Sequence, residues 1–315
     1  MDLAPDYDKI FENKLVLITG VARSGTTLMG KIIGSFENAQ YLFEPNAFLL
    51  IPPLIKKGLL PKKEGGELLK SILFEDFYLQ MLHGRYVNFN KNDDSYIGNY
   101  ISESIVKKSW NDFERRTDVM NYLEDHDYFF VLKAPSVHTF LDLIKDLFKG
   151  LKVVDIIRDG NDVVSSSIRR DMFSDDDLNY RNIDWSYPTK GLKVPWFVDE
   201  KNRIAFQKWN YHTRVALMWN VLTELSLKFA EKNKSDVFQF KYDDFIKNPK
   251  KYLADIEIFL GRKKTDITTK HIESIKSYTY RDYPDISPKL ASPVKEKYIA
   301  LQKKLGYAKE EMVLP

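Results

Sequence analysis

Residues 15–28, LVLITGVARSGTTL, constrain the fold of this chain more than any other segment. The apolar run at the start has the composition of a buried parallel strand, and glycine permits a tight turn after it. Gly20, Gly25 and Thr27 fit the pattern G-x-x-x-x-G-K-[ST] at every position but one. In such a strand-loop-helix unit, backbone N–H groups at the start of the helix surround an anion. The segment therefore predicts a phosphate-binding loop.

The exception is the lysine of that pattern, whose position holds Thr26. In nucleoside triphosphatases this lysine reaches the β- and γ-phosphates, so its absence argues against ATP or GTP as the ligand. Arg23 supplies a cation within the loop instead, and Ser24 and Thr27 add hydroxyl groups. The sequence therefore predicts a phosphate ligand that is not a nucleoside triphosphate.

The order of apolar runs and helical patterns predicts the fold class. Runs bounded by turn residues indicate five strands, at 15–20, 40–43, 128–133, 151–157 and 236–241. Strands that alternate with helices are typical of a parallel sheet covered by helices. We therefore predict an α/β fold in which a single domain, 1–315, has a parallel β-sheet flanked by helices.

A long insertion separates the second and third predicted strands. Residues 46–125 are mostly helical in pattern, with breaks expected at Pro52-Pro53, Pro61 and Gly65-Gly66. An insertion of this kind commonly covers an active site, so we expect a helical insertion to shape the substrate pocket.

A second irregular region lies later in the chain. Residues 174–202 show little periodicity, and we interpret them as a long ordered loop. Trp185, Tyr187 and Trp196 lie in it and could stack on a base or an acceptor. The apolar pattern of 203–233 then predicts one long helix.

Composition narrows the classes of function. The chain is 43% hydrophobic and 14% aromatic, which is ample for a core, and its net charge of +3 gives no strong electrostatic case for nucleic acid. The absence of cysteine excludes disulfides, thiolate metal sites and cysteine nucleophiles. The five histidines lack metal-ligand spacing, so we expect no zinc site. The acidic N-terminus lacks a signal-peptide pattern and no apolar run is long enough for a transmembrane segment, which favours a cytoplasmic location.

The second informative segment is KVVDIIRDGNDVVSSSIRR at 152–170. Arg158 lies at the carboxyl end of a predicted strand, and Ser166 follows about two helical turns later, so both can face a ligand above the sheet. An arginine in this place is more often an ion-pair residue when it stands alone. Together with the loop at 20–28, however, it indicates a second phosphate-binding group.

With both motifs in view, the chain resembles the sulfotransferases that use 3′-phosphoadenosine 5′-phosphosulfate (PAPS). Their 5′-phosphosulfate loop matches 20–28, and their 3′-phosphate motif, an arginine followed eight residues later by a serine, matches Arg158 and Ser166. Further segments are similar to the family in the same order: FVLKAPSVHTFLDLIKDLF at 130–148, FKYDDFIKNPKKYLADIEIFLG at 240–261 and the terminal KYIALQKKLGY. The insertion has no recognisable counterpart.

The resemblance implies a sulfotransferase fold like that of P-loop nucleoside triphosphate hydrolases, with PAPS as the donor, 3′-phosphoadenosine 5′-phosphate (PAP) as the product and no metal. Arg281, in SYTYRDYPD, is a candidate to close the 3′-phosphate site, where the family often has a Gly or Arg-Trp segment. The residues expected to bind the donor are Arg23, Ser24, Gly25, Thr26, Thr27, Leu28, Arg158, Ser166 and Arg281.

Sulfuryl transfer to a hydroxyl group calls for a general base. Glu44, in QYLFEPNAF, is our candidate because it follows the second strand, where ligands of open α/β sheets gather. Tyrosyl-protein and bacterial glycolipid sulfotransferases are similar here, because they have a glutamate base after the strand that follows the first loop. Cytosolic aryl and steroid enzymes instead have a histidine two residues after the lysine of the third strand, and this chain has Pro135 there. Alternatively, Glu44 is an ion-paired surface carboxylate.

Three other residues complete the candidate machinery. Lys133 and Arg23 are expected to stabilise charge on the reacting group and on the leaving phosphate. His138, five residues beyond Lys133, is a fallback base, although a histidine in such a place more often packs or caps.

The sequence does not identify the acceptor. A carbohydrate, a glycolipid or a small metabolite fits the resemblance, and a tyrosyl peptide stays open. Oligomeric state is equally unreadable. The alternatives to a sulfotransferase are a P-loop small-molecule kinase, which would need Mg²⁺ and the missing lysine, and a non-catalytic nucleotide-binding protein.

Overall fold

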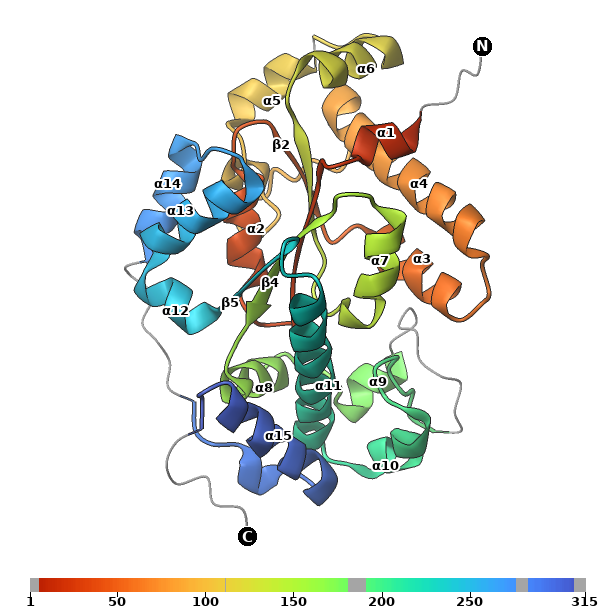
Figure 1. Cartoon of the computed structure of the whole chain (residues 1–315), viewed down its shortest axis with the longest axis vertical. Helices are drawn as coiled ribbons and strands as arrows, with labels where there is room; N and C mark the ends of the chain where they lie inside the picture. The colour runs from red at the N-terminus through yellow and green to blue at the C-terminus, as the bar shows by residue number, and fades with distance from the viewer. Residues whose placement is uncertain (1–5, 111, 181–190, 276–282, 309–315) are drawn as a thin grey trace.

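A single parallel sheet forms the centre of the fold (Figure 1). The computed structural model describes residues 6–110, 112–180, 191–275 and 283–308. All five predicted strands are present within this part of the chain, and they lie in the order β2-β3-β1-β4-β5. Their bounds are β1 Leu15–Gly20, β2 Ala39–Phe43, β3 Phe129–Lys133, β4 Lys152–Ile157 and β5 Val237–Lys241. The predicted fold class is confirmed.

Helices cover both faces of the sheet (Figure 1). On one face lie α1, α3, α4 and α7, and on the other lie α2, α12, α13 and α14. A third group, which includes α8, α11 and α15, packs beyond the carboxyl ends of β1 and β4. The described α-helices are α1 Tyr7–Phe11, α2 Thr26–Gly34, α3 Asn46–Lys56, α4 Lys62–His83, α5 Glu103–Ser109, α6 Arg116–Asp125, α7 Leu141–Leu147, α8 Gly160–Ile168, α9 Asp175–Tyr180, α10 Arg203–Lys208, α11 Tyr211–Lys232, α12 Tyr242–Lys247, α13 Pro249–Leu260, α14 Asp266–Ser274 and α15 Ser292–Lys304.

The sequence of β1 shows why the sheet is covered on both faces. Leu15 and Leu17 pack in the cluster with α1, α3, α4 and α7, whereas Val16 and Ile18 pack in the cluster with α2 and α13. Successive side chains of a strand point to opposite faces. An uninterrupted apolar run is therefore what a strand buried on both sides requires.

Two of the three helix breaks predicted in the helical insertion do not occur. Pro61 does separate α3 from α4, but Pro52 and Pro53 lie inside α3, and Gly65 and Gly66 lie inside α4. Both prolines are buried, so packing on the core offsets the two N–H groups that α3 lacks.

The two glycines have a packing reason. A Cβ atom on Gly65 would lie 2.6 Å from the Ile55 side chain of α3, and one on Gly66 would lie 2.7 Å from Leu147 of α7. These glycines let α4 approach its neighbours instead of ending the helix.

The predicted helix at 203–233 is also corrected, because two helices form there. The backbone is extended at Trp209 and Asn210, and the Asn210 side chain accepts a hydrogen bond from the N–H of Thr213 at 2.9 Å. This side-chain cap starts α11 and ends the preceding helix, α10.

The segment interpreted as a loop at 174–202 begins with α9 and ends with the 3₁₀ turn η3, Glu200–Asn202, so the interpretation is wrong for these residues. Short-range hydrogen bonds explain α9, since Asp177 accepts from the N–H of Phe173 and Ser174 accepts from the N–H of Asp177. Residues 181–190, with Trp185 and Tyr187, lie outside the described residues. The other 3₁₀ turns within the described residues are η1 Ile97–Asn99, η2 His138–Phe140 and η5 Ser287–Lys289.

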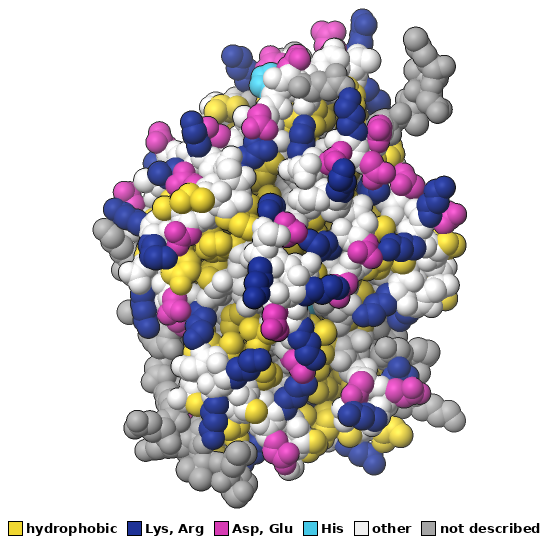
Figure 2. Space-filling model, viewed as in Figure 1, with side chains coloured by type: hydrophobic (Ala, Val, Ile, Leu, Met, Phe, Trp, Pro, Cys, Tyr) yellow, Lys and Arg dark blue, Asp and Glu magenta, His cyan; other side chains and the backbone are white. Residues whose placement is uncertain are grey.

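The surface carries both signs of charge. Figure 2 shows Lys and Arg side chains interspersed with Asp and Glu over one face, in keeping with 48 basic and 45 acidic residues. Among the helices of the described ranges, none is both long and apolar enough to span a membrane.

Two isoleucines of α13 test the packing on the sheet. Ile256 is fully buried, and Ile258 is 81% exposed. We expect Ile256→Ala to lower the free energy of unfolding by about 2–5 kcal/mol, because it leaves a cavity beside the sheet. Ile258→Ala is the matched control and should change it by less than about 0.5 kcal/mol. Urea denaturation of both variants measures the difference, and equal effects would contradict the described packing.

Candidate active site

The predicted phosphate loop joins β1 to α2 at the carboxyl edge of the sheet. Gly25 is the residue before α2, its φ of +99° is one that few other residues adopt, and a Cβ atom there would lie 2.4 Å from the ring of Tyr242. No side chain of the described residues caps the N-terminus of α2. The first N–H groups of this nine-residue helix are therefore available to an anion.

The turn after β3 holds this loop in place. The N–H of Ala22 donates to Ser136 Oγ at 2.9 Å, and the N–H of Ser136 donates to the carbonyl of Gly20 at 2.8 Å. Arg23 and Ser136 both have a positive φ, of 74° and 62°. Non-glycine residues in this region are strained, and such strain is concentrated at functional sites.

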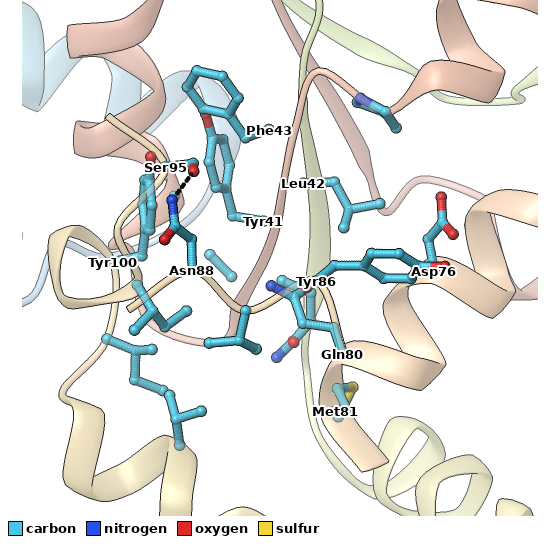
Figure 3. A pocket seen from close by; sticks show the side chains of 18 of the residues that line it. Tyr41, Leu42, Phe43, Asp76, Gln80, Met81, Tyr86, Asn88, Ser95 and Tyr100 are labelled. Carbon is cyan, nitrogen blue, oxygen red and sulfur yellow. Dashed lines mark hydrogen bonds between the residues drawn. The ribbon is translucent and has the colours of Figure 1, made fainter. Parts of the chain in front are cut away.

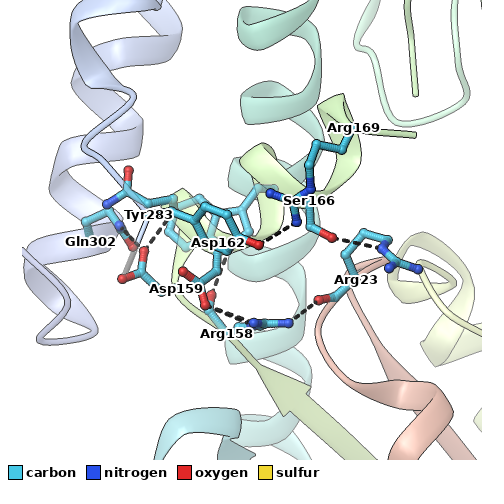
Figure 4. A network of polar contacts seen from close by, with 10 residues as sticks. Arg23, Arg158, Asp159, Asp162, Ser166, Arg169, Tyr283 and Gln302 are labelled. Atoms are coloured by element: carbon cyan, nitrogen blue, oxygen red, sulfur yellow. Dashed lines mark hydrogen bonds and ion pairs between the residues drawn. The ribbon is translucent and has the colours of Figure 1, made fainter. Parts of the chain in front are cut away.

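The structure brings together three residues that the sequence predicted to act together (Figure 4). Arg23 Nε donates to Ser166 Oγ at 3.1 Å, and Arg158 Nη1 donates to the carbonyl of Arg23 at 2.9 Å. Partial burial, together with the charges of Arg170 and Arg158, lowers the pKa of Arg23. Several guanidinium groups therefore meet at the phosphate loop, which favours an anionic ligand.

A carboxylate also lies in this cluster. Arg158 donates through Nε and Nη2 to Asp162 Oδ2, at 3.2 and 2.9 Å (Figure 4). Burial, assisted by the charges of Asp159 and Asp243, raises the pKa of Asp162 to about 6, even though Arg158 acts in the opposite direction. Asp162 therefore orients the guanidinium of Arg158 while its own charge is poorly compensated.

Sequence reasoning missed the residues that support Arg158. The ring of Tyr242 lies 4.5 Å from its guanidinium carbon, and Trp219 Nε1 donates to its carbonyl at 3.1 Å. Tyr242 directly follows β5, in a segment that the sequence analysis matched without giving this residue a role. Its position at the carboxyl end of a strand could have indicated a place in the site, because ligands of open α/β sheets bind there.

The C-terminal helix α15 supports the start of α8. Gln302 Nε2 donates to Asp159 Oδ1 at 2.7 Å (Figure 4). Tyr298 OH donates to Asn161 Oδ1 at 2.8 Å. Both residues belong to the terminal KYIALQKKLGY segment. These contacts give that segment a structural reason to accompany the Arg158 motif.

Glu44 and Lys133 form an ion pair at the ends of two neighbouring strands. The Lys133 side chain is 3% exposed, the Glu44 side chain is 37% exposed, and the N–H of Glu44 donates to the carbonyl of Lys133 at 3.0 Å. Burial lowers the pKa of Lys133, although Glu44 acts to raise it. Glu44 is another non-glycine residue with a positive φ, of 50°.

His138, the fallback base, is buried in η2. Its Nε2 lies 3.1 Å from Asp155 Oδ1, while Ser226 and Gln239 donate to the other oxygen of Asp155. Burial alone would raise the pKa of Asp155, but His138, Ser226 and Gln239 together hold it below its usual range. The contacts of His138 are those of a packing residue, whereas Glu44 is accessible.

The remaining candidate residues of the phosphate loop are buried or half-buried. Ser24 and Thr26 are buried, Thr27 and Leu28 are half-buried, and Ser24 Oγ has no partner among the described residues. Arg281 lies outside the described residues. Within the described ranges, no group of three His, Asp or Glu side chains is arranged to hold a metal ion. The metal-free site stays a prediction.

A cavity of about 780 Å³ lies beside Glu44 (Figure 3). Its walls come from β2, from α4 and from the segment between α4 and α6, so the helical insertion forms much of this cavity. Figure 3 shows Leu42, Asp76, Gln80, Met81 and Tyr86 on one side of β2, and Tyr41, Phe43, Asn88, Ser95 and Tyr100 on the other.

Comparison with known proteins agrees with this geometry. A sequence model described as the sulfotransferase family matches residues 16–266, which contain the phosphate loop, the Glu44–Lys133 pair and the Arg158 segment. The chain belongs to the sulfotransferase family. It is accordingly a transferase of sulfuryl groups. No curated protein matches the chain by sequence.

The chain is similar to solved structures of sulfotransferases. The sulfotransferase domain from the curacin biosynthetic pathway is 16% identical, has a TM-score of 0.50, and the match covers 94% of this chain and 98% of that one. The sulfotransferase domain from the Synechococcus PCC 7002 olefin synthase is 16% identical with a TM-score of 0.49, over 97% and 98% of the two chains. Sulfotransferase STF1 from Mycobacterium tuberculosis H37Rv is 18% identical with a TM-score of 0.45, over 94% and 79%.

The raised pKa of Asp162 makes stability depend on pH. The ordinary value is 3.8, so between pH 6 and 3.8 the folded protein holds the proton more tightly than the unfolded chain. Stability gained from this group therefore grows as the pH falls through 6. Asp162→Asn removes the titration, and we expect its free energy of unfolding, relative to wild type, to fall by about 1 kcal/mol between about pH 7.5 and pH 5. Urea denaturation at both pH values measures this change, and a pH-independent difference would contradict it.

Proposed function

We propose that this protein transfers a sulfuryl group from PAPS to a hydroxyl acceptor. The observation that carries the proposal is the contact of Arg23 with both Ser166 and Arg158 at the start of α2. One ligand with an anionic group at each of these places satisfies the whole cluster. PAPS has such groups, a 3′-phosphate and a 5′-phosphosulfate.

Arg158 and Ser166 bind the 3′-phosphate in this proposal. Asp162 holds the guanidinium of Arg158 in place, so little side-chain entropy is lost when the phosphate binds. Tyr242 packs against the same guanidinium and offers the face of its ring to the nucleoside. Arg281 stays a candidate to close this part of the site.

The loop binds the 5′ end of the donor. The uncapped N-terminus of α2 presents backbone N–H groups and a positive dipole end, and Arg23 adds a charge. Ser24, Thr26 and Thr27 supply hydroxyl groups. Because a sulfuryl group carries less charge than a phosphoryl group, these donors suffice without a divalent ion. The threonine at the lysine position fits this assignment.

Glu44 and Lys133 serve the reaction itself. Glu44 accepts the proton of the attacking hydroxyl while the acceptor oxygen forms a bond to sulfur and the bond from sulfur to the phosphate oxygen breaks. Lys133 stabilises the negative charge that develops on the leaving PAP. Their ion pair in the free protein keeps both side chains at the junction of the loop and the cavity.

The cavity supports a small-molecule acceptor, with a saccharide or glycolipid as the broader expectation from resemblance. Its lining combines aromatic and aliphatic side chains with a few polar groups, which is usual for sites that bind small molecules. We also propose that 1–315 acts as a single domain, located in the cytoplasm.

The role of Glu44 is tested by Glu44→Gln. Removing the base should lower kcat/KM for transfer of labelled sulfate from PAPS by about 10²- to 10⁴-fold, because the hydroxyl then has no proton acceptor. The dissociation constant for PAP should change by less than about threefold. The assay uses a panel of phenols and alcohols.

The matched control is Glu37→Gln. Glu37 is an exposed carboxylate just before β2, at the opposite end of the strand from Glu44. It should leave both transfer and binding of PAP unchanged. If Glu44→Gln retained the wild-type rate with every acceptor that the protein uses, the base would have to be another group.

A further inference from the structure

The cavity beside Glu44 follows the free edge of the sheet. β2 is an edge strand, and all of its residues line the cavity, from Ala39 to Phe43. The N–H of Glu44 and the carbonyl of Asn38 both bond to β3. Strand geometry then turns the N–H and carbonyl groups of Tyr41 and Phe43 toward the opposite edge, where no described strand pairs with them. A molecule in this cavity lies against a strand edge with hydrogen-bonding capacity.

Most of the cavity wall is apolar or aromatic. Aliphatic and aromatic side chains make up its larger part, among them Leu42, Ile72, Met81, Phe113 and Tyr122. Arginine is absent from the described lining, so an acceptor that carries sulfate, phosphate or carboxylate groups would find little compensation there. The wall favours an acceptor with an apolar body.

One half-buried charge in this wall has no hydrogen-bond or ion-pair partner among the described residues. Asp76, on α4, lines the cavity, and no hydrogen bond or ion pair joins it to any described residue. The carboxylate beside it, Glu75, points elsewhere and accepts two hydrogen bonds from Arg116, each at 2.8 Å. Burial, and secondarily the charge of Glu75, raises the pKa of Asp76. An unpaired carboxylate in such a place costs free energy until a cation or another donor meets it.

The other charges at the cavity do not supply that partner. Glu44 is paired with Lys133, and Lys108 and Asp112 are exposed to solvent. Tyr86 lies on the same side of β2 as Asp76, and aromatic faces stabilise a neighbouring cation (Figure 3). A ligand with a positive group near Asp76 therefore meets a carboxylate, in a cavity whose wall on this side of β2 also includes the ring of Tyr86.

From this we infer that the acceptor is an alcohol or phenol with an apolar body that also carries a protonated amine, and that Asp76 recognises this amine. The inference rests on the proposed function for its reacting end, since the hydroxyl group must reach Glu44. Asp76 is then a specificity-determining residue, because it selects the acceptor and takes no part in the transfer of the sulfuryl group.

The test compares tyramine and its longer homologues with 4-alkylphenols of the same length. Each pair shares the phenol and differs in the ammonium group, and the series of lengths covers the spacing between the two sites. Calorimetry in the presence of PAP measures binding, and labelled PAPS measures transfer. At neutral pH we expect wild type to prefer the amine of the best-fitting pair by roughly 10- to 100-fold, which is the value of a charge-assisted hydrogen bond.

Asp76→Asn should abolish that preference, because the amide keeps the shape and removes the charge. Glu75→Gln is the matched control; it lies next in sequence, is paired with Arg116 outside the cavity, and should keep the preference within about threefold. Binding of PAP to each variant reports that the fold is intact.

The outcomes separate this inference from the proposed function. Amines that bind in an Asp76-dependent way without being sulfated would support recognition by Asp76 and overturn the proposed transfer. Sulfation of phenols with no preference for amines in wild type would support the transfer and overturn the inference. A preference that survives in Asp76→Asn would overturn it as well.

Discussion

The parallel pairing of β1 with both β3 and β4 is the constraint on which the site depends. It brings three strand ends to one edge, so that the loop after Gly20, the turn at Ser136 and the start of α8 lie together. The hydrogen bonds of Ser136 with the loop, and of Arg23 with Ser166, follow from that alignment. Segments more than a hundred residues apart in sequence thereby meet at the proposed anion site. A shift in register would separate the guanidinium groups from the N-terminus of α2.

The charged side chains of this site form two groups that differ in how their charges are compensated. At the loop, Arg23 and Arg158 meet a helix N-terminus, and Asp162 forms an ion pair with Arg158, an arrangement that favours an anionic ligand. At the neighbouring strand ends, Glu44 and Lys133 form an ion pair, and we propose that they serve proton transfer and charge stabilisation. In the proposed function, the first group binds the donor and the second carries out the chemistry. The helical insertion adds the cavity that we propose for the acceptor.

Much of the fold and of the anion cluster could be predicted from local sequence patterns, because neighbouring residues encode buried parallel strands and a glycine loop. The five strands and the meeting of Arg23 with Arg158 follow from such patterns. Other features depend on tertiary contacts, which local sequence patterns do not show. Gly65 and Gly66 read as helix breakers, yet they let α4 pack on α3 and α7. Asp76 gave no signal, because an aspartate on a helix becomes unusual only when the fold leaves it beside a cavity with no partner among the described residues.

The most direct test is the affinity of the protein for PAP relative to ADP, measured by calorimetry in EDTA. The two nucleotides share the adenosine and the 5′-phosphate, and only PAP has the 3′-phosphate that Arg158 and Ser166 are proposed to bind. Charge-assisted hydrogen bonds to that group predict an affinity for PAP at least about 100-fold higher than for ADP. Equal affinities, or tighter binding of ADP when Mg²⁺ is restored, would contradict a phosphosulfate site and favour a triphosphate enzyme.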